Sequence, residues 1–124
     1  MIKLTFCLKR LPHLSREEFQ SYWRDTHAPL VREHADVLKI ARYVQSHSFP
    51  ESASAPLAQA RGSAGKDFDG VAELWWTDME SFASAGMTAE GQEAGRILLE
   101  DEARFIDLAN SPIFLVDEFE VIGR

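Results

Sequence analysis

Four segments in which apolar and polar residues alternate constrain the fold of this chain more than any other feature of its sequence. In residues 2–9, the side chains of Ile2, Leu4, Phe6 and Leu8 fall on one face, which indicates a strand with one buried side. The remaining patterns indicate strands at 39–49, 69–76 and 113–122, and helices at 15–28, 29–38, 77–85 and 88–108. The order β-α-β-β-α-β predicts an α+β, ferredoxin-like fold, a four-stranded antiparallel sheet with its helices on one face.

The sheet face opposite the helices is predicted to keep apolar and aromatic side chains. A lone ferredoxin-like domain usually buries such a face against a second copy of itself. We therefore expect a homodimer that forms through the sheet face.

The length of the chain, 124 residues, is that of a single domain, which we expect to span residues 1–124. Residues 50–68 interrupt the alternating pattern because they are rich in Ser, Ala and Gly. A connection of this length is uncommon in a small domain and is usually either mobile or functional. We expect a long flexible loop here.

Charge and hydropathy exclude several classes of partner. The net charge is −7, with 13 Lys and Arg against 20 Asp and Glu, which argues against nucleic-acid binding. No apolar run approaches the roughly 20 residues that span a bilayer, so we expect no membrane partner. The first residues do not follow the pattern of a signal peptide, and we expect a cytoplasmic location.

Neither a metal nor a cofactor is expected. Cys7 is the one cysteine, and the four histidines have no zinc-type spacing with Cys, Asp or Glu. The glycine patterns of dinucleotide-binding and phosphate-binding loops are also absent from the sequence.

The first predicted helix contains the most informative candidate residue, His27. Ser15 and Glu18 have the spacing of a capping box, which marks the start of this helix. At 100° per residue, Phe19, Trp23 and His27 form one stripe toward the core, and His27 falls in the last turn before Pro29. An imidazole there can serve as an acid or base near neutral pH, or it can cap a carbonyl of its own helix.

Tyr43 and His47 share one face of the second predicted strand, but roughly 13 Å separates residues four apart, so they cannot touch. The Tyr43 hydroxyl can hold a carbonyl or enolate oxygen, or the side chain can be a half-buried strand aromatic. His47 is a candidate ligand contact or, alternatively, a polar surface residue.

Glu102 lies within an apolar stripe of the last helix, beside Leu98, Phe105 and Ile106. A carboxyl group in this position is costly unless it is paired or reaches water, and a raised pKa would suit it to proton transfer. The alternative is a structural hydrogen bond or an ion pair with an arginine.

The apolar walls of a ligand pocket would come from four aromatic residues. Trp75 and Trp76 face opposite sides of the sheet, so at most one of them lines a given cavity. We assign this role to Phe19, Trp23, Trp75 and Phe105.

The run Leu14–Leu30, with its Trp-x(3)-His-Ala-Pro stretch, resembles the signature helix of the EthD family in the dimeric α+β barrel superfamily. The segments Tyr43–Gln45, Phe68–Trp75 and Asp101–Asp107 are similar to the same family in the same order. The resemblance implies a ferredoxin-like protomer, a barrel made by two sheets packed face to face, and a small-molecule pocket between helices and sheet.

The resemblance also implies the chemistry. Relatives in the superfamily include cofactor-free polyketide cyclases, a methylmuconolactone isomerase, fungal dehydratases and cofactor-free monooxygenases. The family's histidine falls on His27 and its strand tyrosine on Tyr43, a pair that transfers protons and anchors a carbonyl in such relatives. We therefore expect a cofactor-independent lyase or isomerase for a small cyclic, aromatic or polyketide-like carbonyl compound. The alternatives are a cofactor-free monooxygenase and a non-catalytic binding or accessory dimer.

Overall fold

The computed structural model describes the backbone of residues 1–124 and all side chains except that of Glu51. The strands are β1 (Ile2–Leu8), β2 (Arg42–His47), β3 (Gly70–Trp76) and β4 (Ile113–Val116). The helices are α1 (Arg16–Tyr22), the π-helical turn η1 (Trp23–His27), α2 (Ala28–His34), α3 (Glu51–Ala60), α4 (Met79–Ala85), α5 (Ala89–Glu102) and the 3-10 turn η2 (Leu108–Asn110). In the part of the chain that is described, no helix combines the length and the apolar character needed to cross a membrane.

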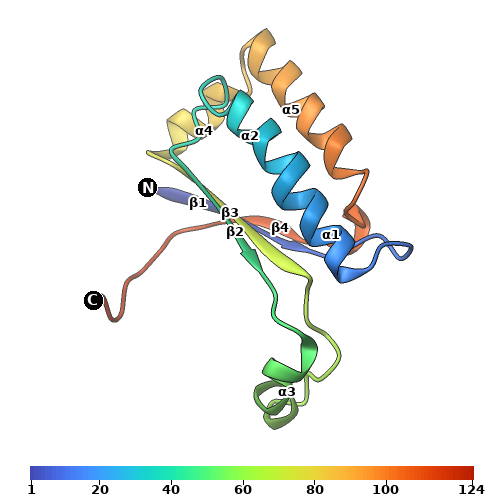
Figure 1. Ribbon diagram of the computed structural model, residues 1–124. Coiled ribbons are helices and arrows are strands. Elements are labelled where there is room, and N and C mark those ends of the chain that lie inside the picture. Colours follow the sequence, from blue (N-terminus) through green and yellow to red (C-terminus); the bar gives the residue numbers. More distant parts are fainter.

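The four strands form one antiparallel sheet in the order β2-β3-β1-β4. Figure 1 shows α1, α2 and α5 together on one side of this sheet, whereas α3 lies apart from them beyond the ends of β2 and β3. The predicted α+β, ferredoxin-like fold is therefore confirmed.

The register of the strands decides which side chains face the helices. Phe6 pairs with Ala72, and Leu74 pairs with both Leu4 and Tyr43, so all of these side chains lie on the helix side. The core between helices and sheet is built from the buried residues Phe6, Leu8, Phe19, Trp23, Ala72, Phe105 and Ile106.

The second strand and the last helix are shorter than predicted, at Arg42–His47 and Ala89–Glu102, and two other segments differ more from the prediction. The segment predicted as a flexible loop, 50–68, contains the helix α3, because its alanines favour a helix although Pro56 and the serines do not. The fourth strand ends at Val116 rather than at Ile122. It is an edge strand, and its four residues pair with Lys3 to Phe6 of β1.

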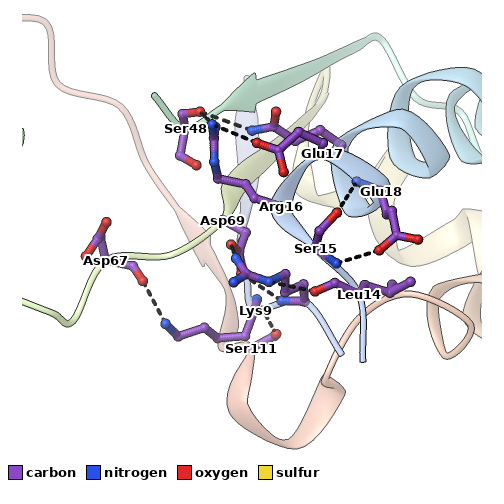
Figure 2. Close-up of polar contacts among 12 residues, drawn as sticks. Lys9, Leu14, Ser15, Arg16, Glu17, Glu18, Ser48, Asp67, Asp69 and Ser111 are labelled. Atoms are coloured by element: carbon purple, nitrogen blue, oxygen red, sulfur yellow. Dashed lines mark hydrogen bonds and ion pairs between the residues drawn. The ribbon is translucent and has the colours of Figure 1, made fainter. Parts of the chain in front are cut away.

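Polar contacts tie both ends of the segment that carries α3 to the core (Figure 2). At one end, the Arg16 guanidinium donates a hydrogen bond to the Ser48 carbonyl at 2.8 Å. At the other end, the buried carboxylate of Asp69 accepts a 2.8 Å hydrogen bond from the backbone N–H of Arg10 and pairs with its guanidinium. Further hydrogen bonds of this kind run from Gln20 to Ser48 and from Lys9 to the Asp67 carbonyl. The segment between Ser48 and Asp69 that carries α3, which we call the insertion, is thus held to the core at both of its ends.

Candidate active site

One helical run from Arg16 to His34 carries the predicted stripe and contains a π-helical turn in its middle. The helix does not break before Pro29 as the sequence suggested, because the Ala28 N–H bonds to the Trp23 carbonyl, five residues earlier. A proline has no N–H and crowds the carbonyl four residues before it, and a π-turn relieves this conflict. Phe19, Trp23 and His27 remain on the core side, with 0%, 1% and 5% of their surface exposed.

The His27 ring is held by a carboxylate on another helix, not by a carbonyl of its own helix. Its Nδ1 atom lies 2.7 Å from Oδ2 of Asp101 in α5, and both side chains are buried. The other oxygen of Asp101 accepts hydrogen bonds from the Tyr22 hydroxyl at 2.6 Å and from the Arg104 guanidinium at 3.0 Å. This arrangement places three donors around one carboxylate, which favours its ionised form.

These contacts set the protonation of both groups. Burial raises the pKa of Asp101, but the hydrogen bonds from Tyr22, His27 and Arg104 outweigh it, and the pKa is lowered overall. An ionised Asp101 can only accept, so Nδ1 of His27 carries the proton and Nε2 has a free electron pair. Burial lowers the pKa of His27, although the Asp101 charge opposes the shift. His27 is therefore a neutral base at neutral pH.

A cavity of about 50 Å³ lies beside His27, between the helices and the sheet. Three of the predicted site residues line it together with His27, namely Tyr43, Glu102 and Trp23. His27 lines this cavity, whereas Asp101, which holds Nδ1 of its ring, does not. The rest of the lining is aliphatic and aromatic, which keeps the dielectric constant low around these polar groups.

Tyr43 reaches the cavity from β2. Its hydroxyl accepts a 2.9 Å hydrogen bond from Nε2 of Gln45, two residues along the same strand. Burial raises the pKa of Tyr43, so the phenol keeps its proton at neutral pH.

Glu102 reaches the cavity from the end of α5. Burial, and after it the charge of Asp101, raises the pKa of Glu102 to about 7. Arg104 bonds to Asp101 rather than to Glu102, and among the described side chains none donates a hydrogen bond to the Glu102 carboxyl group or pairs with it. The predicted alternative of a structural hydrogen bond or an ion pair with an arginine therefore does not apply. Near neutral pH, Glu102 is present both as an acid and as a carboxylate.

The remaining predicted site residues lie outside the cavity. Phe19 and Phe105 are fully buried behind it, where the Phe105 ring packs 5.0 Å from the His27 ring, centroid to centroid. His47 stacks on Trp23 at a centroid distance of 4.5 Å and contacts Gln45. The prediction that Trp75 forms a wall is wrong, because its register with Lys3 and Arg42 places it on the other face of the sheet.

Sequence reasoning missed Asp101 and Gln45. The signal for Asp101 was present, because Leu98, Asp101 and Phe105 have the helical spacing of one buried stripe. Gln45 alternates with Tyr43 and His47 on one strand face and could have been included with them.

A larger hollow, of about 540 Å³, lies near the base of the insertion and is lined by none of the predicted site residues. Its cations are already engaged: Lys9 with a carbonyl and Arg16 with Ser48, as Figure 2 shows, and Arg10 with Asp69. We therefore assign the polar groups of this hollow to the attachment of the insertion. Among the described residues, no group of three His, Cys, Asp or Glu side chains could hold a metal ion.

The sequence of this chain matches a known family of domains. A sequence model of the EthD domain matches residues 11–109, and the chain belongs to the EthD family, as its motifs predicted. The comparison with curated proteins found no match.

Three solved structures are similar to this chain at identities that show the fold alone. An ethyl tert-butyl ether D (EthD) family protein from Bacillus halodurans has 20% identity and a TM-score of 0.62, covering 96% of this chain and 100% of that chain. A dimeric protein of unknown function with a ferredoxin-like fold, from Bacteroides fragilis, has 8% identity and a TM-score of 0.57, with coverages of 94% and 95%. SnoaB from Streptomyces nogalater, described as a cofactor-independent oxygenase, has 15% identity and a TM-score of 0.55, with coverages of 99% and 97%.

Proposed function

We propose that this protein is a cofactor-independent enzyme of the lyase or isomerase type, a dehydratase, cyclase or isomerase. It moves a proton next to the carbonyl group of a small cyclic, aromatic or polyketide-like compound. The observation that carries the proposal is the His27 ring, whose Nδ1 is held by Asp101 and which lines a cavity together with Tyr43 and Glu102.

In the proposed reaction, Nε2 of His27 takes the proton from the carbon next to the substrate carbonyl. The electron pair of that C–H bond moves into a new C=C bond and onto the carbonyl oxygen, which gives an enolate. The Tyr43 hydroxyl donates a hydrogen bond to this oxygen, where the negative charge develops. Asp101 stabilises the imidazolium that forms.

The second half of the reaction returns the proton. In an isomerase, the imidazolium of His27 gives it to a different carbon of the enolate. In a dehydratase, the enolate expels a hydroxyl group from the neighbouring carbon, which leaves as water with a proton from the neutral form of Glu102. The imidazolium of His27 then gives its proton back to the Glu102 carboxylate through solvent, and both groups are restored. Both outcomes use the groups that line the same cavity.

The size of the cavity fits the reacting edge of a substrate. A volume of about 50 Å³ holds one carbonyl group and its neighbouring carbons but not a whole ring system. A groove of about 240 Å³ adjoins it, and Val31 and Tyr43 line both spaces. We propose that the rest of the substrate lies in this groove, since small-molecule sites usually measure about 300 Å³ or more.

Replacement of His27 tests the proposal. Carbonyl compounds are first screened for an increase in the melting temperature of the protein, because only ligands that bind the native state raise it. Exchange of the α-proton of each hit is then followed by NMR in D2O. We expect His27→Gln to abolish catalysed exchange while the circular dichroism spectrum stays unchanged. His13→Gln, at an exposed histidine, is the matched control, and a fully active His27→Gln protein contradicts the mechanism.

A cofactor-free monooxygenase is the second candidate, favoured by the likeness to SnoaB and by Trp23 at the cavity. A monooxygenase of this kind would share the first step, in which His27 removes a proton from carbon. The resulting carbanion then reacts with dioxygen, so that an anthrone and O2 yield an anthraquinone and water. Measurement of oxygen uptake with anthrone separates the two. Uptake that depends on His27 supports the oxygenase, and proton exchange without uptake supports the lyase or isomerase.

We further propose that the protein forms a homodimer through the sheet face opposite the helices. Phe114, half exposed, and Val71 lie on this face by their register with Thr5 and Cys7. A structure with the same fold is described as dimeric. Sedimentation of the wild type and of Phe114→Asp tests this: we expect a dimer that the substitution weakens, and a wild-type monomer contradicts it. Ligand binding by the dimer without any turnover would instead identify an accessory binding protein.

A further inference from the structure

We infer that Gln45 is a positioning residue that fixes the Tyr43 hydroxyl as a hydrogen-bond donor toward the ligand and ties it to the turn that carries His27. This inference rests on the proposed function and narrows its substrates to compounds that present an oxygen acceptor at this point.

The contacts of the Gln45 side chain determine its orientation. Its Nε2 atom lies 2.9 Å from the Trp23 carbonyl oxygen, which can only accept, so the amide nitrogen faces this side. The same nitrogen lies 2.9 Å from the Tyr43 hydroxyl and donates its second hydrogen there. Both amide hydrogens are thereby used.

His47 completes the arrangement on the other side of the amide. Its Nε2 atom lies 2.8 Å from Oε1 of Gln45, which accepts, so Nε2 of His47 carries the proton. Its Nδ1 atom is buried and has no hydrogen-bond partner in the described part of the chain. Burial, with a contribution from Arg24, lowers the pKa of His47, which keeps the ring neutral. A neutral His47 with one proton on Nε2 holds the Gln45 amide in a single orientation.

The chain of donors runs in one direction, from His47 through Gln45 to Tyr43. The Tyr43 oxygen receives a hydrogen from Gln45, and its own hydrogen is left to donate into the cavity that Tyr43 lines. A ligand atom opposite Tyr43 must then be an acceptor. A ketone or enolate oxygen meets this requirement, and an ammonium group does not.

Gln45 also acts on the other proposed catalytic residue. The Trp23 carbonyl accepts both from Gln45 and from the Ala28 N–H, the bond that closes the π-turn ending at His27. One amide group therefore joins β2 to the helix turn that positions the imidazole. Loss of this amide removes the hydrogen-bonded link between Tyr43 and the turn, while the stacking of His47 on Trp23 remains.

The experiment uses the two tyrosines of the chain, Tyr22 and Tyr43. Tyrosine labelled with ¹³C at Cζ gives two signals, and Tyr22→Phe assigns them. In Gln45→Met we expect the Tyr43 signal to move and its titration to shift upward by about one pH unit, because a donor to the phenolate is lost. Gln20→Met, which removes an amide bonded to Ser48, is the matched control and leaves the Tyr43 signal in place.

Two further measurements do not depend on that variant. His47→Phe keeps an aromatic ring against Trp23 but removes the donor to Gln45, and we expect a smaller shift of the Tyr43 signal in the same direction. In the wild type, ¹H–¹⁵N correlation of the histidine side chains is expected to show the proton of His47 on Nε2. A proton on Nδ1, or a Tyr43 signal that stays unmoved in folded Gln45→Met, overturns the inference.

These readouts need no substrate, so they separate this inference from the proposed function. Shifted Tyr43 signals together with an active His27→Gln protein would retain the positioning role of Gln45 and reject the mechanism. An unmoved Tyr43 signal with an inactive His27→Gln protein would do the reverse.

Discussion

The Nδ1 atom of His27 and the Oδ2 atom of Asp101 lie 2.7 Å apart, although 74 positions separate the two residues in the sequence. The contact joins the π-turn η1 to the last turn of α5, and both partners are buried. It gives the imidazole one orientation and one tautomer, which a base that works in a small cavity requires.

Asp101→Asn tests this relationship. An asparagine is neutral and its amide can donate as well as accept, so Nδ1 of His27 loses its fixed acceptor. We expect kcat/KM to fall by about 100-fold, and the free energy of unfolding by about 3 kcal/mol, because Tyr22 and Arg104 lose a charged acceptor as well.

A pH profile distinguishes this role from a structural one. The Asp101 charge raises the pKa of His27, so the acid limb of kcat/KM moves to lower pH in Asp101→Asn. The control is Asp25→Asn, at an exposed ion pair with Arg24. An Asp101→Asn enzyme with wild-type kcat/KM contradicts the proposed orientation of His27.

The wild-type pH profile is expected to be a narrow bell if a neutral Glu102 supplies the second proton. The acid limb falls below pH 6.5, since burial lowers the pKa of His27 from that value and only the neutral ring is a base. The alkaline limb falls near pH 7, where Glu102 loses its proton. We expect Glu102→Gln to remove the alkaline limb and leave the acid limb in place, and an unchanged alkaline limb shows that another group is the acid.

Stability is expected to respond to Glu102 in a defined direction. Its pKa is raised from 4.5 to about 7 in the folded protein, so between these values the folded state binds a proton that the unfolded state has released. The free energy of unfolding therefore falls as the pH rises from 4.5 to 7. Glu102→Gln has no carboxyl group here and does not undergo this loss of stability. Between pH 4 and pH 8, we therefore expect its free energy of unfolding, measured by urea titration, to rise by about 3 kcal/mol relative to that of the wild type. Parallel curves for the two proteins contradict the raised pKa.

Gly70 allows Trp23 to pack beside the sheet. A Cβ atom at Gly70 would lie 2.4 Å from Cζ3 of Trp23 and 2.9 Å from the Ser46 carbonyl oxygen. We expect Gly70→Ala to destabilise the protein by about 2 kcal/mol or more and to disturb the cavity that Trp23 lines. Gly95 lies in a solvent-exposed helical position, and a Cβ atom added there would have no neighbouring atom within 4 Å. We therefore expect Gly95→Ala to raise the free energy of unfolding by about 0.5–1 kcal/mol. Thermal unfolding of both variants tests the contrast, which equal melting temperatures would contradict.

Much of the fold follows from local patterns in the sequence. Two kinds of local pattern involve only a few residues each: the alternation in β1 and β3, and the capping box of Ser15. The structure contains both strands and the capping box as predicted. In α3, the alanines favour a helix whereas Pro56 disfavours one, so the local sequence does not show whether a helix forms. The π-turn is a similar case, because Pro29 ends most helices unless the preceding turn widens.

The candidate site was predicted only in part for a related reason. A helical stripe identifies the buried face of His27 and of Glu102, which lines the same cavity. It does not reveal which helix lies opposite, and the pairing of His27 with Asp101 arises from the packing of two helices. For Trp75, the alternating pattern does not show which face of the sheet carries the side chain. The pairing of Trp75 with Lys3 in the structure places it on the face opposite the helices.

The attachment of the α3 segment has a consequence for how this protein can be altered. Hydrogen bonds at Ser48 and at Asp69 close the segment at its base, and Figure 1 shows α3 far from the helices that carry His27. We expect that the stretch between these two anchors can be replaced by a peptide of another length without strain reaching the proposed catalytic groups. It is the natural position at which to graft a reporter or a second binding module onto this scaffold.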